Sequence, residues 1–270
     1  MWASVKRALQ AYRCGSGRGA RAGLCQWYAG PLGQSLAGCE QRLLDDNLYN
    51  LFGYHLLQVG APQGVDLTTT SRIAHRMVLV DDLAAVPTLG GSEGCIGRPE
   101  ALPVATDSID LVLLPHVLAF ADEPHQVLRE AERALIPEGH VAVLGFNPWS
   151  LWGLCRLMLG WRRRTPWCGR FLSPWRVKDW LSLLGFDTVL LRYVYYRPPL
   201  RHPGLLQRLQ FLEGWGQRWW PILGGGYLLV AKKRVATLTP IRPRWRPRRA
   251  LVPAGLAGPT VRKQEHDGKL

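Results

Sequence analysis

Residues 101–146 decide the fold, and they read ALPVATDSIDLVLLPHVLAFADEPHQVLREAERALIPEGHVAVLGF. Residues 109–114 are a short apolar run that stops at Pro115, which is typical of a buried strand. Residues 123–136 predict a helix, because a proline at position 124 costs nothing in a first turn and the apolar residues share one helical face. Residues 140–146 predict the next strand. A strand, a helix and a strand in this order predict a parallel pair covered by a helix.

The residues before this stretch continue the same alternation. Residues 55–59 predict a buried strand that ends at Gly60, and residues 65–76 predict a weak helix. A second strand is predicted at residues 77–80 and a short third strand at 95–96. We therefore expect an α/β fold with a mostly parallel sheet that has helices on both faces.

The ends of the chain differ from its centre. Residues 1–44 predict a helical lead-in, and residues 147–172 predict an insertion that is rich in tryptophan and arginine. Residues 236–270 combine arginine, proline and glycine, which predicts a disordered basic tail. The domain between lead-in and tail is expected to span residues 45–235. Its later elements are predicted as a helix at 173–184 and strands at 187–196 and 226–232.

Charge is divided unevenly along the 270 residues, whose net charge is +14. Residues 40–140 carry six basic and 15 acidic residues, a net charge of −9. Residues 141–270 carry 23 basic and five acidic residues, a net charge of +18. A uniformly basic nucleic-acid binder does not show this division, so the two regions are expected to meet different partners.

Cysteine spacing and hydropathy bear on the cellular location of the protein. The six cysteines form no C-x-x-C pair, which argues against a disulfide framework or a zinc site and favours a cytoplasmic location. The N-terminus has no uninterrupted apolar stretch of the kind that a secretory signal needs. The most apolar stretch, residues 141–161, contains Asn147-Pro148 and Arg156, so we expect no membrane-spanning helix there.

Glycines and an acid suggest a nucleotide-type ligand at the first two strands. Gly60 and Gly64 follow the first strand, where backbone N–H groups at the start of a helix can meet a ligand. Asp81 comes 21 residues after Gly60, close to the spacing of a ribose-binding acid in dinucleotide-type folds. A tight turn and a solvent-facing carboxylate are the plainer interpretations of these features.

Two further positions flank the strand at 109–114. His116 follows its carboxyl end, which faces the ligand crevice in open α/β sheets, so it is a candidate base or hydrogen-bond donor. The plainer interpretation is a structural histidine bonded to a loop carbonyl. Leu102 is a candidate cover for a flat ring whose edge its backbone N–H would read, or else a loop anchor in the core.

The order of these motifs resembles a class I S-adenosylmethionine-dependent methyltransferase of the methyltransferase-11 type. The match is carried by Leu102-Pro103, by residues 107–118 (DSIDLVLLPHVL), and by the helix and turn that follow at 122–140. Residues 146–153 (FNPWSLWG) resemble an uncharacterised proteobacterial branch of that family. The resemblance covers about residues 45–235. It implies a Rossmann-like sheet of seven strands, mostly parallel, with an antiparallel last strand.

The resemblance also implies functional roles by position. S-adenosylmethionine is the implied cofactor, an unidentified small molecule is the implied methyl acceptor, and no metal is implied. Gly60 and Gly64 would cradle the methionine part of the cofactor. Asp81 would bind the ribose, with Asp82 as the fallback, and Leu102 would contact the adenine. His116 is the implied catalytic residue, beside the reactive sulfonium. The implied cofactor-binding residues are Gly60, Gly64, Asp81, Asp82, Leu102 and Pro115.

Departures from the family pattern keep other functions open. Gln58 stands where the family usually has an acid, Ala61-Pro62 interrupts its Gly-x-Gly core, and Arg98 stands where an acid often meets the adenine. The alternative is a catalytically degenerate methyltransferase-like module that binds RNA or an anionic membrane. A nicotinamide oxidoreductase is disfavoured, because the chain lacks a Gly-x-Gly-x-x-Gly sequence after the first strand.

The insertion allows three interpretations. Residues 150–164 predict a helix with leucines, a methionine and a tryptophan largely on one side and arginines towards its end. Such a helix suits a membrane interface, a lid over a hydrophobic or anionic substrate, or a packed subdomain that covers the sheet. The arginines of the tail are candidate contacts for RNA or acidic lipid.

Overall fold

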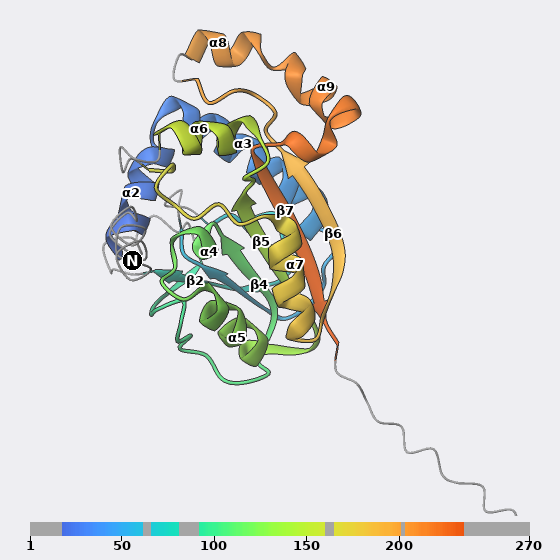
Figure 1. Ribbon diagram of the computed structural model, residues 1–270. Coiled ribbons are helices and arrows are strands. Elements are labelled where there is room, and N and C mark those ends of the chain that lie inside the picture. Colours follow the sequence, from blue (N-terminus) through green and yellow to red (C-terminus); the bar gives the residue numbers. More distant parts are fainter. Residues whose placement is uncertain (1–17, 62–65, 81–91, 160–164, 201–202, 235–270) are drawn as a thin grey trace, which may run out of the picture. The chain divides into compact units, whose positions relative to one another are not determined.

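The computed structural model describes residues 18–61, 66–80, 92–159, 165–200 and 203–234, which belong to one compact unit that ends at Val235. Their strands form a single sheet in the order β3-β2-β1-β4-β5-β7-β6 (Figure 1). Strands β1 to β5 are parallel, whereas β7 is antiparallel to both of its neighbours. The predicted seven-stranded, mostly parallel sheet with an antiparallel last strand is thus confirmed. The strands are β1 His55–Val59, β2 His75–Val80, β3 Glu93–Ile96, β4 Ile109–Pro115, β5 Leu135–Phe146, β6 Phe186–Val194 and β7 Gly226–Lys233.

The helix predicted at residues 65–76 is wrong: the described part of this segment forms turns before β2 begins at His75. The Asp66 carboxylate accepts hydrogen bonds from the backbone N–H of Thr68, at 2.7 Å, and from the Thr68 hydroxyl. Such local side-chain bonds compete with helical hydrogen bonding, and the following threonines have low helix propensity. The chain therefore turns where the apolar spacing suggested a helix.

The boundary between the next helix and strand also moves. Helix α5, Pro124–Ala134, ends two residues before the predicted end, and β5 starts at once with Leu135. The Pro-Glu-Gly sequence at 137–139, predicted as a turn, lies inside this strand. The pairing of β4 with β5 shifts register there, and Glu138 adopts a φ of 65°. An irregular strand replaces the turn because pairing with β4 continues on both sides of it.

Helices cover both faces of the sheet, as predicted. Helices α5 and α7, Pro174–Leu183, pack on the face that presents Leu57, Val112 and Val143. Helix α3, Pro31–Leu48, packs its last turns on the opposite face, which presents Leu56 and Leu111. Neighbouring residues of one strand point to opposite faces, so each strand supplies both cores.

A third core joins the lead-in to the insertion. Helix α2, Arg18–Tyr28, the first half of α3, and helices α4, Val117–Phe120, and α6, Leu151–Leu159, contribute to it together with Phe146. Helix α3 runs without a break across the expected boundary between residues 44 and 45. The N-terminal helices and the insertion therefore share one core above the carboxyl ends of β4 and β5.

Three short helical segments between β6 and β7 were not assigned from the sequence. They are α8 Pro203–Arg208, α9 Phe211–Trp219 and the 3₁₀ turn η3 Pro221–Leu223. In Figure 1 they lie at the same end of the sheet as α6. None of the helices within the described segments has both the length and the apolar character that a membrane crossing needs.

Candidate active site

The candidate site lies where the strand order reverses. From β1 the chain crosses to β2 on one side, whereas β4 pairs with β1 on the other side. Ligands of open α/β sheets bind in the crevice beyond the carboxyl ends at such a point. Gly60 follows β1 and His116 follows β4, so the fold brings these two predicted positions to one edge.

Gly60 has a backbone that a ligand can approach. Its φ is +83°, a conformation that glycine adopts without strain, and its N–H donates to the carbonyl of Leu79 at 2.8 Å. Among the described residues, a Cβ added here would meet only Val117 Cγ2, at 3.8 Å. Gln58 is fully buried and ties the loop together, because it donates to the Gly60 carbonyl and accepts from the N–H of Leu67.

Three predicted cofactor residues lie outside the described residues: Gly64, Asp81 and Asp82. The two aspartates directly follow Val80, the last residue of β2. The described part of this edge fits S-adenosylmethionine in one respect, since an open glycine backbone admits the methionine part of the cofactor. The net negative charge of residues 40–140 also suits a cationic sulfonium.

Leu102 and Pro115 are both buried parts of the fold. The N–H of Leu102 donates to the Glu130 carboxylate at 3.0 Å, and its carbonyl accepts from Arg133 at 3.1 Å. That N–H is engaged within the protein, so the loop-anchor interpretation describes the backbone of Leu102. Pro115 ends β4 opposite Leu144 of β5 and fixes where the strand stops.

His116 is held in a strained and almost fully buried position. It adopts a left-handed φ of 57°, and its ring stacks on Phe146 with a centroid distance of 4.1 Å. A left-handed conformation is uncommon for residues other than glycine and recurs at functional sites. Its Nε2 lies 2.7 Å from Oε1 of Glu40, and both side chains are only 1 % exposed. The partner of this histidine is thus a carboxylate and not a loop carbonyl.

Glu40 belongs to α3 and receives a second hydrogen bond from α2. The hydroxyl of Tyr28 donates to Oε2 of Glu40 at 2.9 Å. Burial, and secondarily the Glu40 charge, holds the pKa of Tyr28 well above its ordinary value, so the phenol keeps its proton. Facing a carboxylate, Nε2 of His116 donates, and in the neutral imidazole Nδ1 then carries the lone pair. Nδ1 is buried, and no hydrogen-bond partner for it occurs among the described residues.

Tyr28 and Glu40 were not predicted from the sequence, although the position of Glu40 carries a recognisable signal. The inward face of α3 repeats every four residues, and Glu40 interrupts it as the one charged residue. A charge in the middle of an apolar helical stripe is expensive unless it is paired. The apolar residues of this stripe are Leu32, Leu36, Leu44 and Leu48.

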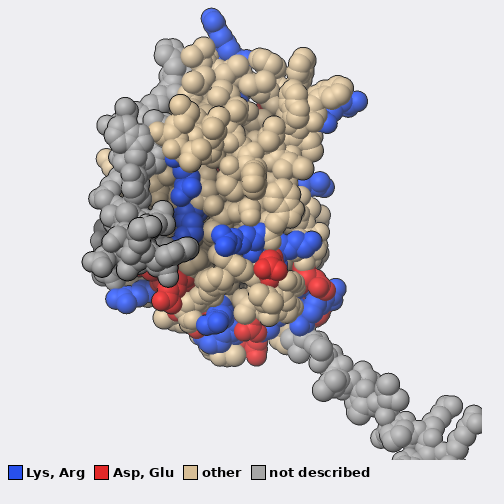
Figure 2. All heavy atoms as spheres, viewed as in Figure 1, with Lys and Arg blue, Asp and Glu red and all other residues tan. Residues whose placement is uncertain are grey.

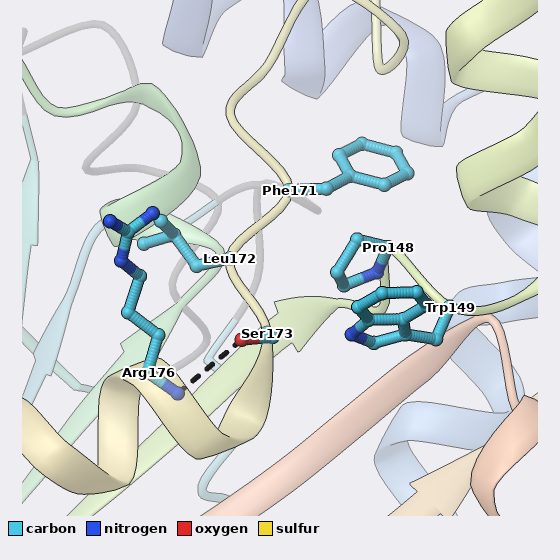
Figure 3. A pocket seen from close by; sticks show the side chains of 6 residues that line it. All are labelled: Pro148, Trp149, Phe171, Leu172, Ser173 and Arg176. Carbon is cyan, nitrogen blue, oxygen red and sulfur yellow. Dashed lines mark hydrogen bonds between the residues drawn. The ribbon is translucent and has the colours of Figure 1, made fainter.

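A cavity of about 270 Å³ opens next to this cluster, between the end of β5 and the start of α7. In Figure 3, Phe171 lies with Pro148 and Trp149 on one side, and the Arg176 guanidinium lies on the other side. The ring of Phe171 stacks on Phe146 at 5.0 Å, and Phe146 stacks on His116. The cavity is therefore separated from the buried histidine by two aromatic rings.

The described residues also bear on metal and cysteine chemistry. Within the described segments, no group of three or more His, Cys, Asp and Glu side chains is arranged to hold a metal ion. Cys168 is disulfide-bonded, which the cysteine spacing did not anticipate.

Comparison with known proteins identifies the class. A family model described as a methyltransferase domain matches residues 57–143. A solved S-adenosylmethionine-dependent methyltransferase of Thermotoga maritima has a TM-score of 0.55 at 15 % identity, covering 77 % of this chain and 93 % of that one. A second, from Archaeoglobus fulgidus, has a TM-score of 0.50 at 16 % identity, covering 72 % and 94 %. Residues 57–143 match a methyltransferase domain, and the chain has the fold of class I S-adenosylmethionine-dependent methyltransferases, as the motifs predicted; S-adenosylmethionine is the cofactor of this class.

The family within this class is also defined. The chain is 32 % identical over 213 residues to the uncharacterized protein YafS of Escherichia coli K12, covering 79 % of this chain and 82 % of YafS. It belongs to the YafS family. A [4+2]-cyclase, SpnF, is similar in fold as well, with a TM-score of 0.52 at 17 % identity, covering 73 % and 80 %. The fold alone therefore does not fix the reaction.

Proposed function

We propose that this protein transfers a methyl group to a small-molecule acceptor at the carboxyl edge of the sheet, with His116 as the catalytic base. One observation carries the proposal: Nε2 of His116 is held by Glu40 while Nδ1 is buried without a partner among the described residues. A general base needs this arrangement, in which a carboxylate fixes the tautomer and leaves the other nitrogen able to accept a proton.

The proton balance follows from this tautomer. S-adenosylmethionine, when bound, would supply an electrophilic methyl group on a positively charged sulfur; the sulfur–methyl bond breaks as the acceptor–methyl bond forms, and the neutral thioether is the leaving group. Nδ1 of His116 takes the proton that an O–H or N–H group of the acceptor loses on methylation. The imidazolium that results carries its charge beside the Glu40 carboxylate, which stabilises it. Tyr28 keeps that carboxylate in place through its hydroxyl.

The cofactor roles implied by the resemblance belong to the same proposal. Gly60 and Gly64 admit the methionine part, and Asp81, with Asp82 as the fallback, binds the ribose hydroxyls. Pro115 positions His116 by ending β4. The side chain of Leu102 contacts the adenine, without its backbone N–H.

The cavity beside α7 supplies an acceptor site of defined chemistry. Its walls are mostly apolar or aromatic, with Trp149 and Phe171 as the large rings. Arg176 adds a guanidinium with no carboxylate partner among the described residues. The rings of Phe146 and Phe171 lie between this cavity and His116, so we assign to it a part of the acceptor remote from the methylated atom, with an apolar or aromatic body and an anionic group. The cytoplasmic location stays a prediction from the sequence.

Calorimetry and a label-transfer assay test the proposal together. S-adenosylmethionine is titrated into the wild-type protein, and methyl-labelled cofactor is then incubated with metabolite fractions from the source organism. We expect cofactor binding and one labelled fraction. His116→Ala should bind the cofactor but lose label transfer by about 10²-fold or more. His125→Ala, which removes an exposed histidine of α5, is the matched control and should transfer label normally.

Glu40→Gln separates positioning from folding, because His116→Ala empties a buried site. With the glutamine amide donating to Nε2, the proton moves to Nδ1, so kcat should fall about tenfold or more while the KM for the cofactor stays unchanged. Absence of cofactor binding at millimolar concentration would overturn the methyltransferase proposal. Normal transfer by a folded His116→Ala protein would overturn the role of His116 alone.

A further inference from the structure

We propose that the end of the molecule formed by α6, α9 and η3 docks on an anionic lipid surface. This inference goes beyond methyl transfer and does not depend on it. The aromatic end is defined here by nine exposed side chains. They are Trp149, Leu151, Leu154, Leu157, Met158, Phe211, Trp215, Trp219 and Trp220.

Apolar exposure is concentrated at this end. Of the 20 large apolar side chains that are exposed among the described residues, 13 lie within residues 149–158 and 200–223. Leu157 is 82 % exposed and Trp219 is 68 % exposed. Apolar exposure concentrated in this way marks an interaction site in a folded protein. The two parts adjoin, because the Asn147 side chain donates to the carbonyl of Ile222 at 2.7 Å and to that of Gly224 at 2.9 Å.

Helix α9 turns its apolar stripe outward because its inner face is already used. Gly216 lies so close to the Tyr196 ring that a Cβ would come within 2.2 Å of it, and Glu213 pairs with Arg197 at 3.1 Å. The opposite stripe holds Phe211, Trp215 and Trp219 at intervals of four residues, all exposed. An amphipathic helix with its apolar face to solvent has the form of an interfacial helix.

Helix α6 shows the same inversion. Trp152 faces inward and is 1 % exposed, whereas Leu151, Leu154 and Met158 face outward. The apolar side of α6, which as a lid or a packed subdomain would cover a substrate or the sheet, is thus exposed to solvent. Aliphatic side chains beside tryptophans match the boundary between acyl chains and headgroups, where tryptophan is enriched.

Charge around the aromatic end favours anionic lipid. Arg208 and Arg218 are exposed on α8 and α9, and the one acid within residues 197–225, Glu213, is neutralised by Arg197. Figure 2 shows most of the red acidic side chains of the visible face in its lower half, away from the α8–α9 end. Each basic residue near an anionic membrane adds to the attraction.

The same observations disfavour RNA as the partner. Binding to a phosphate backbone requires several cations on the contact surface, and the described part of this end exposes two arginines among many apolar groups. Leucine and methionine provide no stacking platform for bases. A lipid surface satisfies both the aliphatic and the aromatic residues.

Vesicle sedimentation with the full-length protein, without cofactor, tests the inference. The probes are vesicles of phosphatidylglycerol and phosphatidylcholine, compared with pure phosphatidylcholine. We expect binding to the anionic vesicles, and about tenfold weaker binding for Trp215→Ser/Trp219→Ser. Trp175→Ser, which removes an exposed tryptophan of α7, is the control and should bind as wild type. Arg208→Gln and Arg218→Gln should each weaken binding about fivefold.

All variants keep residues 235–270, so any contribution of that basic segment is common to them. Equal loss in the Trp175 control, or equal binding of all variants, overturns the inference. Tighter binding to polyuridylate than to vesicles overturns it in favour of RNA. Concentration-dependent self-association that the double variant abolishes overturns it in favour of a second copy of the chain. Vesicle binding without cofactor binding would leave this inference intact while overturning the proposed function.

Discussion

Two tryptophan-rich regions of this protein differ in what surrounds them. Around Phe146, the rings of Trp27, Trp152 and Phe171 lie within 6.4 Å of its own ring centroid, and Trp152 is 1 % exposed. At the aromatic end, Trp219 is 68 % exposed. The first region is covered by α2, α3 and α4, whereas the outer stripe of α9 faces solvent. The comparison teaches that a tryptophan stabilises the fold only where a second element covers it.

The largest expected effect is the difference between two alanine substitutions. Trp152→Ala should destabilise the protein by about 3–5 kcal/mol, because it leaves a cavity and frees the carbonyl that Nε1 bonds. That carbonyl belongs to Arg197, at 3.1 Å. Trp219→Ala should change the free energy of unfolding by less than about 0.5 kcal/mol. Urea denaturation measures both, and similar losses would break the comparison.

The second test addresses the polar group inside the buried region. Tyr28→Phe removes the hydroxyl that donates to Glu40 and should destabilise the protein by about 2 kcal/mol, because a hydrogen bond to a buried carboxylate is lost. The Nε2–Oε1 contact of His116 remains. Tyr54→Phe, at a tyrosine that is 78 % exposed, is the control and should be neutral. A neutral Tyr28→Phe protein in chemical denaturation would show that the buried carboxylate does not need this donor.

The third test compares two glycines of the same backbone conformation. Gly60 and Gly185 have φ values of +83° and +82°, and neither lacks space for a Cβ among the described residues. Each alanine substitution should cost about 1 kcal/mol through the left-handed conformation alone. Only Gly60→Ala should also weaken S-adenosylmethionine binding in calorimetry, because only Gly60 lies at the ligand edge. Equal cofactor affinity of the two variants would contradict that role.

The smallest effect is a pH dependence at the Leu102 loop, far in the sequence from either aromatic region. The Arg133 hydrogen bond holds the pKa of Glu130 below its ordinary value of 4.5. The folded protein therefore binds a proton there less readily than the unfolded chain. This stabilisation is present above about pH 4.5 and is lost as the pH falls through the lowered pKa.

Glu130→Gln should thus lower the free energy of unfolding at pH 7 by less than about 1 kcal/mol. The free energy of unfolding of the variant should also fall less steeply than that of the wild type as the pH is lowered. Thermal unfolding between pH 7 and pH 3 measures this difference. Glu123→Gln, at an exposed position just before α5, serves as the comparison and should follow the wild-type profile. An unchanged acid limb in Glu130→Gln would contradict the assigned pKa direction.

Much of the sheet was predictable because strand signals are local. Residues 55–59 and 226–232 were placed nearly to the residue, since buried strands are short apolar runs between breakers. The segment at 65–76 failed because Asp66 competes locally for the backbone of Thr68. Elements α8 and α9 were missed because they have only six and nine residues, too few for a helical pattern to stand out in the sequence.

The position of His116 at the end of β4 followed from the sequence, since a strand pattern states where its carboxyl end lies. Its partner did not, because Glu40 is 76 residues away and pairing at that separation depends on how α3 crosses the sheet. The burial of Trp152 and the exposure of Trp219 were decided in the same way. Local patterns record which residues form each element, whereas coverage of one element by another is settled only when the whole chain packs.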